Sequence, residues 1–101
     1  MHIVVSWDIQ TDAKSAKWIE VNGKLREGLK GYSWVRPLTT FYVVRVASDA
    51  DRTVIRDRLV EAAKPAGITV HIVISPAMAG GRYDGFLPKD TWGKLNERSD
   101  P

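Results

Sequence analysis

Six segments with hydrophobic periodicity follow one another along the chain, and their order leaves few folds open. Four of them have the alternation or the β-branched content of strands, and two have apolar residues at helical spacing. The order is strand, helix, strand, strand, helix, strand. The predicted strands are 2–8, 32–38, 40–47 and 68–75, and the predicted helices are 12–30 and 48–64.

The first predicted helix has a competing interpretation, because Asn22-Gly23 is a strong hairpin-turn dipeptide. A helical wheel, however, gathers four apolar residues on one side: Trp18, Val21, Leu25 and Leu29. This pattern favours a helix. We expect Thr11 or Asp12 to cap its start and Gly31 to end it.

Capping and turn residues mark the other boundaries. Ser48 followed by Asp51 resembles a capping box at the start of the second helix, and Pro65 and Gly67 end that helix. Pro37 has no backbone N–H, so we expect it at a turn or at an edge of the sheet.

The order of these segments is that of the split βαβ unit. It predicts an α+β, ferredoxin-like βαββαβ fold with a four-stranded antiparallel sheet and two helices on one face. Residues 1–86 would form this domain, and residues 87–101 a C-terminal arm or tail with a short helical turn near 90–95. With both helices on one face, the other face of the sheet would be bare. Because the strands are apolar on both faces, that bare face would be an exposed apolar patch. A two-fold homodimer would cover such a patch.

Composition excludes several classes of protein. The chain has no cysteine, which rules out disulfides, thiolate metal sites and cysteine nucleophiles. No apolar run approaches the roughly 20 residues that cross a bilayer, and the N-terminus does not resemble a signal peptide. We therefore expect a cytoplasmic protein without a membrane partner. The net charge of +3 is compatible with a polyanionic partner.

Most catalytic motifs are absent. The segment 23–30 lacks the Gly-Lys-Ser/Thr sequence of a phosphate-binding loop, and no serine lies in a Gly-x-Ser-x-Gly context. Neither His2 nor His71 has a carboxylate at the spacing of a helical zinc site. Both are interpreted as half-exposed strand residues.

Asp8 is the exception, because it follows an apolar strand at the point where the chain leaves the sheet. It can cap the next turn, or it can bind a metal ion. One carboxylate is a poor Mg²⁺ site, but a two-fold axis beside this strand end would bring two copies of Asp8 together. Two carboxylates and water molecules suit a Mg²⁺ ion that supports phosphodiester cleavage.

Basic and aromatic residues are candidates for contacts to nucleic acid. Lys14 and Lys17 come early in the first helix, and Arg36 lies in the predicted hairpin. Such cations neutralise phosphates, while Trp34 or Tyr83 can stack on unpaired bases. The arginines of the second helix are at the spacing of a solvated face with acidic partners: Arg52, Arg56 and Arg58 with Asp51, Asp57 and Glu61.

Two segments carry a family resemblance. The strand that ends in Ser6-Trp7-Asp8-Ile9 and the Arg56-Asp57-Arg58-Leu59 core of the second helix resemble the small CRISPR-associated adaptation nuclease superfamily. This group includes VapD-type toxins and SinR-like small proteins. The resemblance spans roughly residues 1–86 and implies a ferredoxin-like homodimer. In it the strand-one aspartates of the two chains, here Asp8, face each other across the interface and support metal-dependent cleavage of RNA or DNA.

The sequence departs from this family in two places. Lys14 and Lys17 stand where the family often has arginines. Residues 35–41 read Val-Arg-Pro-Leu-Thr-Thr-Phe, where the family often has Val-Gln-x-Ser-Val-Phe.

Together these observations predict a nucleic-acid-binding homodimer, with Mg²⁺-dependent endoribonuclease or endonuclease activity as the chemistry that Asp8 would support. Phosphates would be contacted by Lys14, Lys17, Arg36 and Arg82. The alternative is a non-catalytic dimeric interaction or scaffold module that uses its sheet face and C-terminal arm. A third class is a ligand-sensing domain of the same topology.

Overall fold

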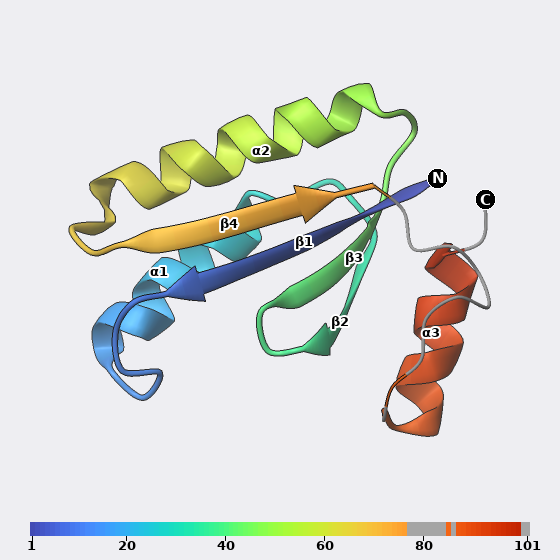
Figure 1. The fold of residues 1–101 in the computed structure, drawn as a ribbon, viewed down its shortest axis with the longest axis horizontal. Helices are drawn as coiled ribbons and strands as arrows, with labels where there is room; N and C mark the ends of the chain where they lie inside the picture. Colours follow the sequence, from blue (N-terminus) through green and yellow to red (C-terminus); the bar gives the residue numbers. More distant parts are fainter. Residues whose placement is uncertain (77–84, 86, 100–101) are drawn as a thin grey trace.

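A central antiparallel sheet with helices on both faces organises the chain (Figure 1). The computed structural model describes residues 1–76, 85 and 87–99. Its elements are β1 (His2–Ile9), α1 (Ala16–Glu27), β2 (Trp34–Leu38), β3 (Phe41–Arg45), α2 (Ala50–Ala63), the 3-10 turn η1 (Lys64–Ala66), β4 (Val70–Ser75) and α3 (Lys89–Ser99). Every predicted strand and helix forms; β1 extends one residue beyond the predicted 2–8, and the other predicted strands and helices are shorter than expected. None of these helices is long and apolar enough to cross a membrane.

The four strands lie in the order β2-β3-β1-β4, and all their pairings are antiparallel. β1 is central, because it pairs with β3 on one side and with β4 on the other. In this register Ser6 lies opposite Phe41 of β3 and Val73 of β4. The predicted four-stranded antiparallel sheet is therefore confirmed.

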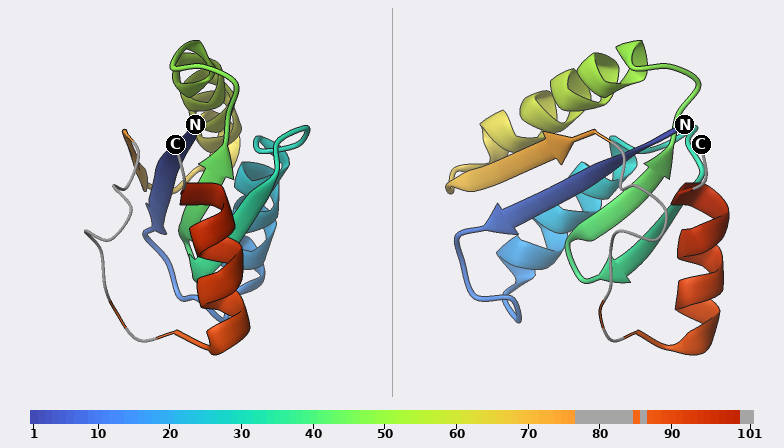
Figure 2. Two further views of the ribbon diagram at one scale, coloured as in Figure 1. Left: turned by 90° about the vertical axis from the view of Figure 1, so that its right-hand side faces the viewer. Right: turned by 45° about the vertical axis from the view of Figure 1, so that its right-hand side comes forward.

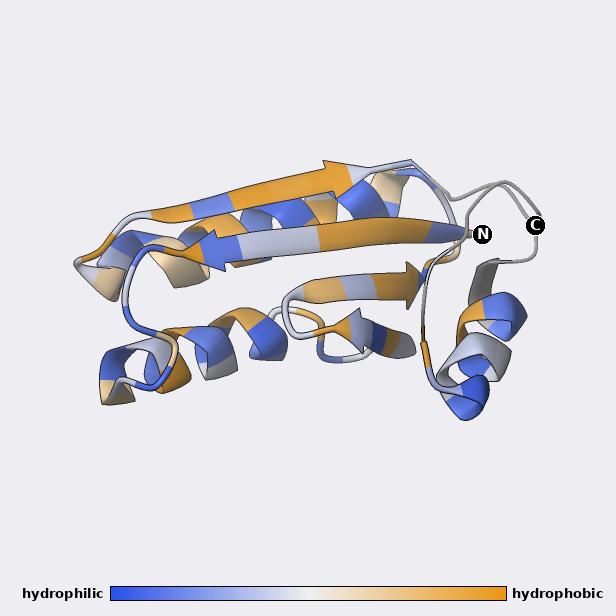
Figure 3. Cartoon of the chain, turned by 60° about the horizontal axis from the view of Figure 1, so that its bottom comes forward, coloured by the Kyte–Doolittle hydropathy of each residue, from blue (hydrophilic) through white to orange (hydrophobic). Residues whose placement is uncertain are grey.

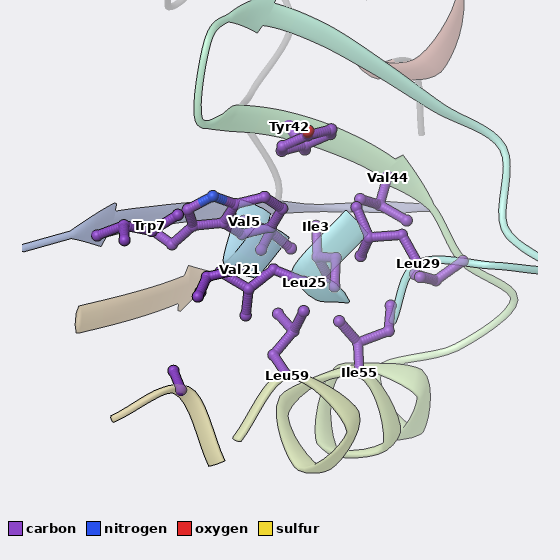
Figure 4. Packing of buried hydrophobic residues seen from close by; sticks show 13 residues of the cluster. Ile3, Val5, Trp7, Val21, Leu25, Leu29, Tyr42, Val44, Ile55 and Leu59 are labelled. Atoms are coloured by element: carbon purple, nitrogen blue, oxygen red, sulfur yellow. The ribbon is translucent and has the colours of Figure 1, made fainter. Parts of the chain in front are cut away.

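The main core lies between one sheet face and helices α1 and α2 (Figure 4). Alternation along β1 sends Ile3, Val5 and Trp7 into this core, where they meet Leu25 of α1 and Leu59 of α2. All of these side chains are buried. We call this side of the sheet the inner face.

The sequence predicted a bare outer face, on the opposite side of the sheet, and this prediction is wrong. Helix α3 packs there against β2 and β3 (Figure 2). Leu95 of α3 is buried against Val35 and Val43, with Leu87 and Trp92 at the margin of this second cluster. The expected short helical turn is thus a helix of 11 residues. It leaves the β1–β4 half of the outer face without a helix among the described residues.

The start of α1 differs from the expected cap. The N-cap is Ser15, whose hydroxyl oxygen accepts a hydrogen bond of 3.1 Å from the backbone N–H of Trp18. Asp12 instead accepts from the backbone N–H of Lys14 in the preceding turn. Asn22 and Gly23 lie within the helix, so the hairpin interpretation is wrong.

Candidate metal and nucleic-acid site

Asp8 is the second-last residue of β1. Figure 3 shows a hydrophilic band near that end of a largely hydrophobic strand. Trp7, the neighbour of Asp8, points to the inner face, where the residue is 3% exposed. The ring of Trp7 stacks on that of Tyr42, with a distance of 4.7 Å between the ring centroids. Alternation then directs Asp8 to the outer face, and its side chain is exposed. The buried indole therefore anchors the strand directly beside the exposed carboxylate.

Two polar side chains adjoin Asp8. The side-chain amide of Gln10 donates a hydrogen bond to Oδ2 of Asp8. His71 of β4 is the residue directly opposite Asp8 in the β1–β4 pairing, and it is also exposed. Because directly opposite residues of an antiparallel pair share a face, the imidazole and the carboxylate lie side by side on the outer face. Within the described ranges, Asp8 forms no ion pair with a Lys or Arg.

A metal ion at Asp8 would need ligands beyond the side chains that the structure describes in one chain. Asp8 offers the carboxylate oxygens that Mg²⁺ prefers. Among residues 1–76, 85 and 87–99, however, no group of three or more histidine or acidic side chains could hold a metal ion. The donor chemistry of Asp8 therefore fits Mg²⁺ as one contribution to a shared site.

Lys14 and Lys17 follow β1 at the same end of the sheet as Asp8. Lys14 is exposed in the turn before α1, and Lys17 is half-buried in the first turn of that helix. Neither forms an ion pair among the described residues. Both charges are thus available to a polyanion that approaches the end of β1.

Arg36 is exposed on β2, an edge strand, two strands away from β1. Strand spacing places it about 10 Å across the sheet from β1. It lies in a β-bulge with Pro37, where β2 has one more residue than β3 between Val35 and Leu38. The expected edge position of Pro37 is confirmed. Arg36 therefore does not join Asp8 in a compact cluster.

The other predicted contacts divide into three groups. Arg82 and Tyr83 lie outside the described residues. Trp34 packs against the core rather than forming a stacking platform, since its ring makes a T-shaped contact with the ring of Tyr42 at a centroid distance of 5.1 Å. On α2, Arg56 pairs with Asp57 as predicted, whereas Arg52 pairs with Asp49, which was not among the predicted partners.

Arg58 and Asp51 do not follow the predicted salt-bridge pattern. Arg58 donates to the backbone oxygen of Lys30 and lies over the ring of Tyr32. Asp51 accepts hydrogen bonds from the backbone N–H groups of Ala47 and Ser48. It thus forms the acidic half of the predicted capping box and stabilises the start of α2.

Sequence reasoning did not find His71 as a neighbour of Asp8. The two residues are far apart in the chain, and only the pairing register of β1 and β4 brings them together. The alternation of residues 68–75 could have placed His71 on the same face as Val73, but not opposite Asp8. A comparison with known protein families and with curated proteins finds no significant match to this chain.

Proposed function

We propose that the chain is a ferredoxin-like homodimer that binds nucleic acid and cleaves phosphodiester bonds with a divalent cation shared by the two copies of Asp8. The observation that carries this proposal is the position of Asp8. It is an exposed carboxylate without a cationic partner among the described residues, at the end of a strand that is otherwise buried. The strand order β2-β3-β1-β4, with α1 and α2 on one face, supports the ferredoxin-like assignment.

An apolar side chain on the same open surface supports self-association. Val73 of β4 is 67% exposed, and it lies opposite Ser6 on the half of the outer face that α3 does not cover. A two-fold contact over β1 and β4 would bury Val73 and bring two Asp8 side chains toward one axis. The ion would be held by these two carboxylates, and when bound it would supply Lewis acidity at a phosphodiester.

Cations near this surface would supply affinity for the phosphate backbone. Lys14 and Lys17 flank the Asp8 end of the sheet, and Arg36 lies on the far edge. Each phosphate contact adds to the salt dependence of binding, because condensed counterions are released. Lys14→Ala and Arg36→Ala should therefore each lower the salt slope by about one. Lys24→Ala is the matched control, since Lys24 is paired with Glu20 on α1.

Cleavage is tested with labelled single- and double-stranded RNA and DNA, in Mg²⁺ or in chelator. The wild-type protein is compared with Asp8→Asn, which keeps the side-chain shape, and with Asp57→Asn, which removes an exposed carboxylate of α2. We expect cleavage that needs the metal and Asp8 but not Asp57. Cleavage that persists in Asp8→Asn contradicts the proposal.

Oligomeric state is tested separately by analytical ultracentrifugation. Val73→Lys should convert a dimer to a monomer, because a charge at an apolar interface loses its hydration without gaining a partner. A dimer that binds nucleic acid but does not cleave it would favour the scaffold interpretation over the nuclease. A wild-type monomer at every concentration would contradict the shared site.

A further inference from the structure

Asp8 and His71 form a pair of side chains of the metal-ligating type, and no sequence motif predicts this pair. They are direct cross-strand neighbours in the β1–β4 ladder, and both are exposed on the outer face. The Cβ atoms of such neighbours are about 4.5–5.5 Å apart. From that separation a carboxylate oxygen and an imidazole nitrogen can both reach one ion at the usual ligand distance of roughly 2 Å.

The surroundings of the pair leave ligand atoms available. Gln10 donates to Oδ2 of Asp8, which orients the carboxylate while Oδ1 receives no hydrogen bond from that amide. A hydrogen bond that orients a ligating carboxylate typically strengthens metal binding. No helix covers this half of the outer face among the described residues, because α3 packs on β2 and β3.

We infer that His71 is the second ligand of the Asp8 site and that the site prefers a first-row transition ion, such as Mn²⁺, over Mg²⁺. This inference rests on the metal site of the proposed function and names the class of ion that it takes. Mg²⁺ prefers oxygen ligands and binds imidazole poorly, whereas imidazole is a common ligand of transition ions. In a two-fold dimer the same pair would occur twice and provide two carboxylates and two imidazoles.

The experiment uses Mn²⁺ as the probe, without nucleic acid, and measures the affinity for Mg²⁺ by its competition with Mn²⁺. Mn²⁺ is paramagnetic, so it broadens the amide NMR signals of residues near the ion, and titration of this broadening gives a dissociation constant. We expect broadening centred on residues 8–10 and 70–72. In His71→Gln the affinity for Mn²⁺ should fall about tenfold or more, while that for Mg²⁺ should change by less than about threefold.

Two further variants make the result interpretable. Thr69→Gln places the same new side chain at a nearby exposed position and should keep the wild-type affinity for Mn²⁺. Asp8→Asn should lose binding of both ions. Thermal unfolding of each variant shows that the fold is intact, because all three positions are exposed.

The outcomes separate this inference from the proposed function. If Mn²⁺ binding depends on Asp8 but is unchanged in His71→Gln, the inference is overturned and the nuclease proposal stands. If binding depends on both residues but the protein does not bind or cleave nucleic acid, the inference stands and the proposed function fails. Broadening centred elsewhere, for example on the acidic residues of α2, overturns the inference.

Discussion

The indole Nε1 of Trp7 donates a hydrogen bond of 3.0 Å to Oδ1 of Asn22, and both side chains are buried. The bond joins β1 to α1 within the core, directly behind the exposed Asp8. An amide inside an apolar core is costly unless it is paired, so this contact fixes how the helix sits on the strand.

Removal of this amide should be costly because it leaves a buried donor unpaired. We expect Asn22→Ala to lower the free energy of unfolding by about 1–3 kcal/mol. In the Trp7→Phe background the same change should cost much less, because no indole N–H remains to be satisfied. Urea unfolding of the four proteins measures both values. An equal cost of Asn22→Ala in both backgrounds would show that the hydrogen bond contributes nothing.

Acid should weaken the start of α2 through Asp51. Hydrogen bonds from the backbone of Ser48 and Ala47, and one from the hydroxyl of Tyr32, lower the pKa of Asp51 from its ordinary value of 3.8. Because the folded pKa is the lower one, the stabilisation is fully present above pH 3.8 and is lost as the pH falls through the folded value.

The matching measurement is thermal unfolding between about pH 6 and about pH 2.5. Asp51→Asn should be less stable than wild type at pH 6, and the difference should shrink as the pH falls. Asp57→Asn removes one carboxylate from the same helix and is the control. A difference between Asp51→Asn and wild type that stays constant over the whole range would contradict this assignment.

Leu95 tests whether α3 is part of the cooperative fold. The side chain is 2% exposed, between α3 and the sheet residues Val35 and Val43. Leu95→Ala removes buried methyl groups and should lower the free energy of unfolding by about 2–4 kcal/mol. Exposed Lys89→Ala at the start of the same helix should change it by less than about 0.5 kcal/mol. A small cost at Leu95 would mean that α3 folds independently of the sheet.

The sequence predicted the elements well because their signals are local. The apolar alternation in β1 and the helical spacing in α1 are both set by residues that are close together in the sequence. The cap was missed because Thr11, Asp12 and Ser15 can all cap a helix, and only the path of the turn selects Ser15. The length of α3 was underestimated because Gly93 interrupts it and weakens the local helical signal.

The candidate site was predictable only in part. Asp8 could be selected because it ends an apolar strand, which is a property of the strand alone. Its neighbour His71 could not be selected in this way, because the β1–β4 register pairs two segments that are separated in the sequence by two helices and a hairpin. The extent of the open face was also misjudged, since it depends on where α3 docks.

Substitution by alanine at two glycines should change the free energy of unfolding in opposite directions. Gly23 lies in the middle of α1 and Gly67 lies in the turn before β4, where its φ is +74°. A Cβ atom at either position would meet no atom within 4 Å, so neither change causes a clash. The difference between them is therefore one of backbone conformation alone.

Gly23→Ala should raise the free energy of unfolding by about 0.5–1 kcal/mol, because alanine is the better helix former. Gly67→Ala should lower it by about 1–2 kcal/mol, because an L-residue is strained in the left-handed region. Urea unfolding with an unchanged m-value measures both. Destabilisation by Gly23→Ala would revive the hairpin interpretation of Asn22-Gly23, in which glycine is the favoured residue, and it would contradict α1 as described.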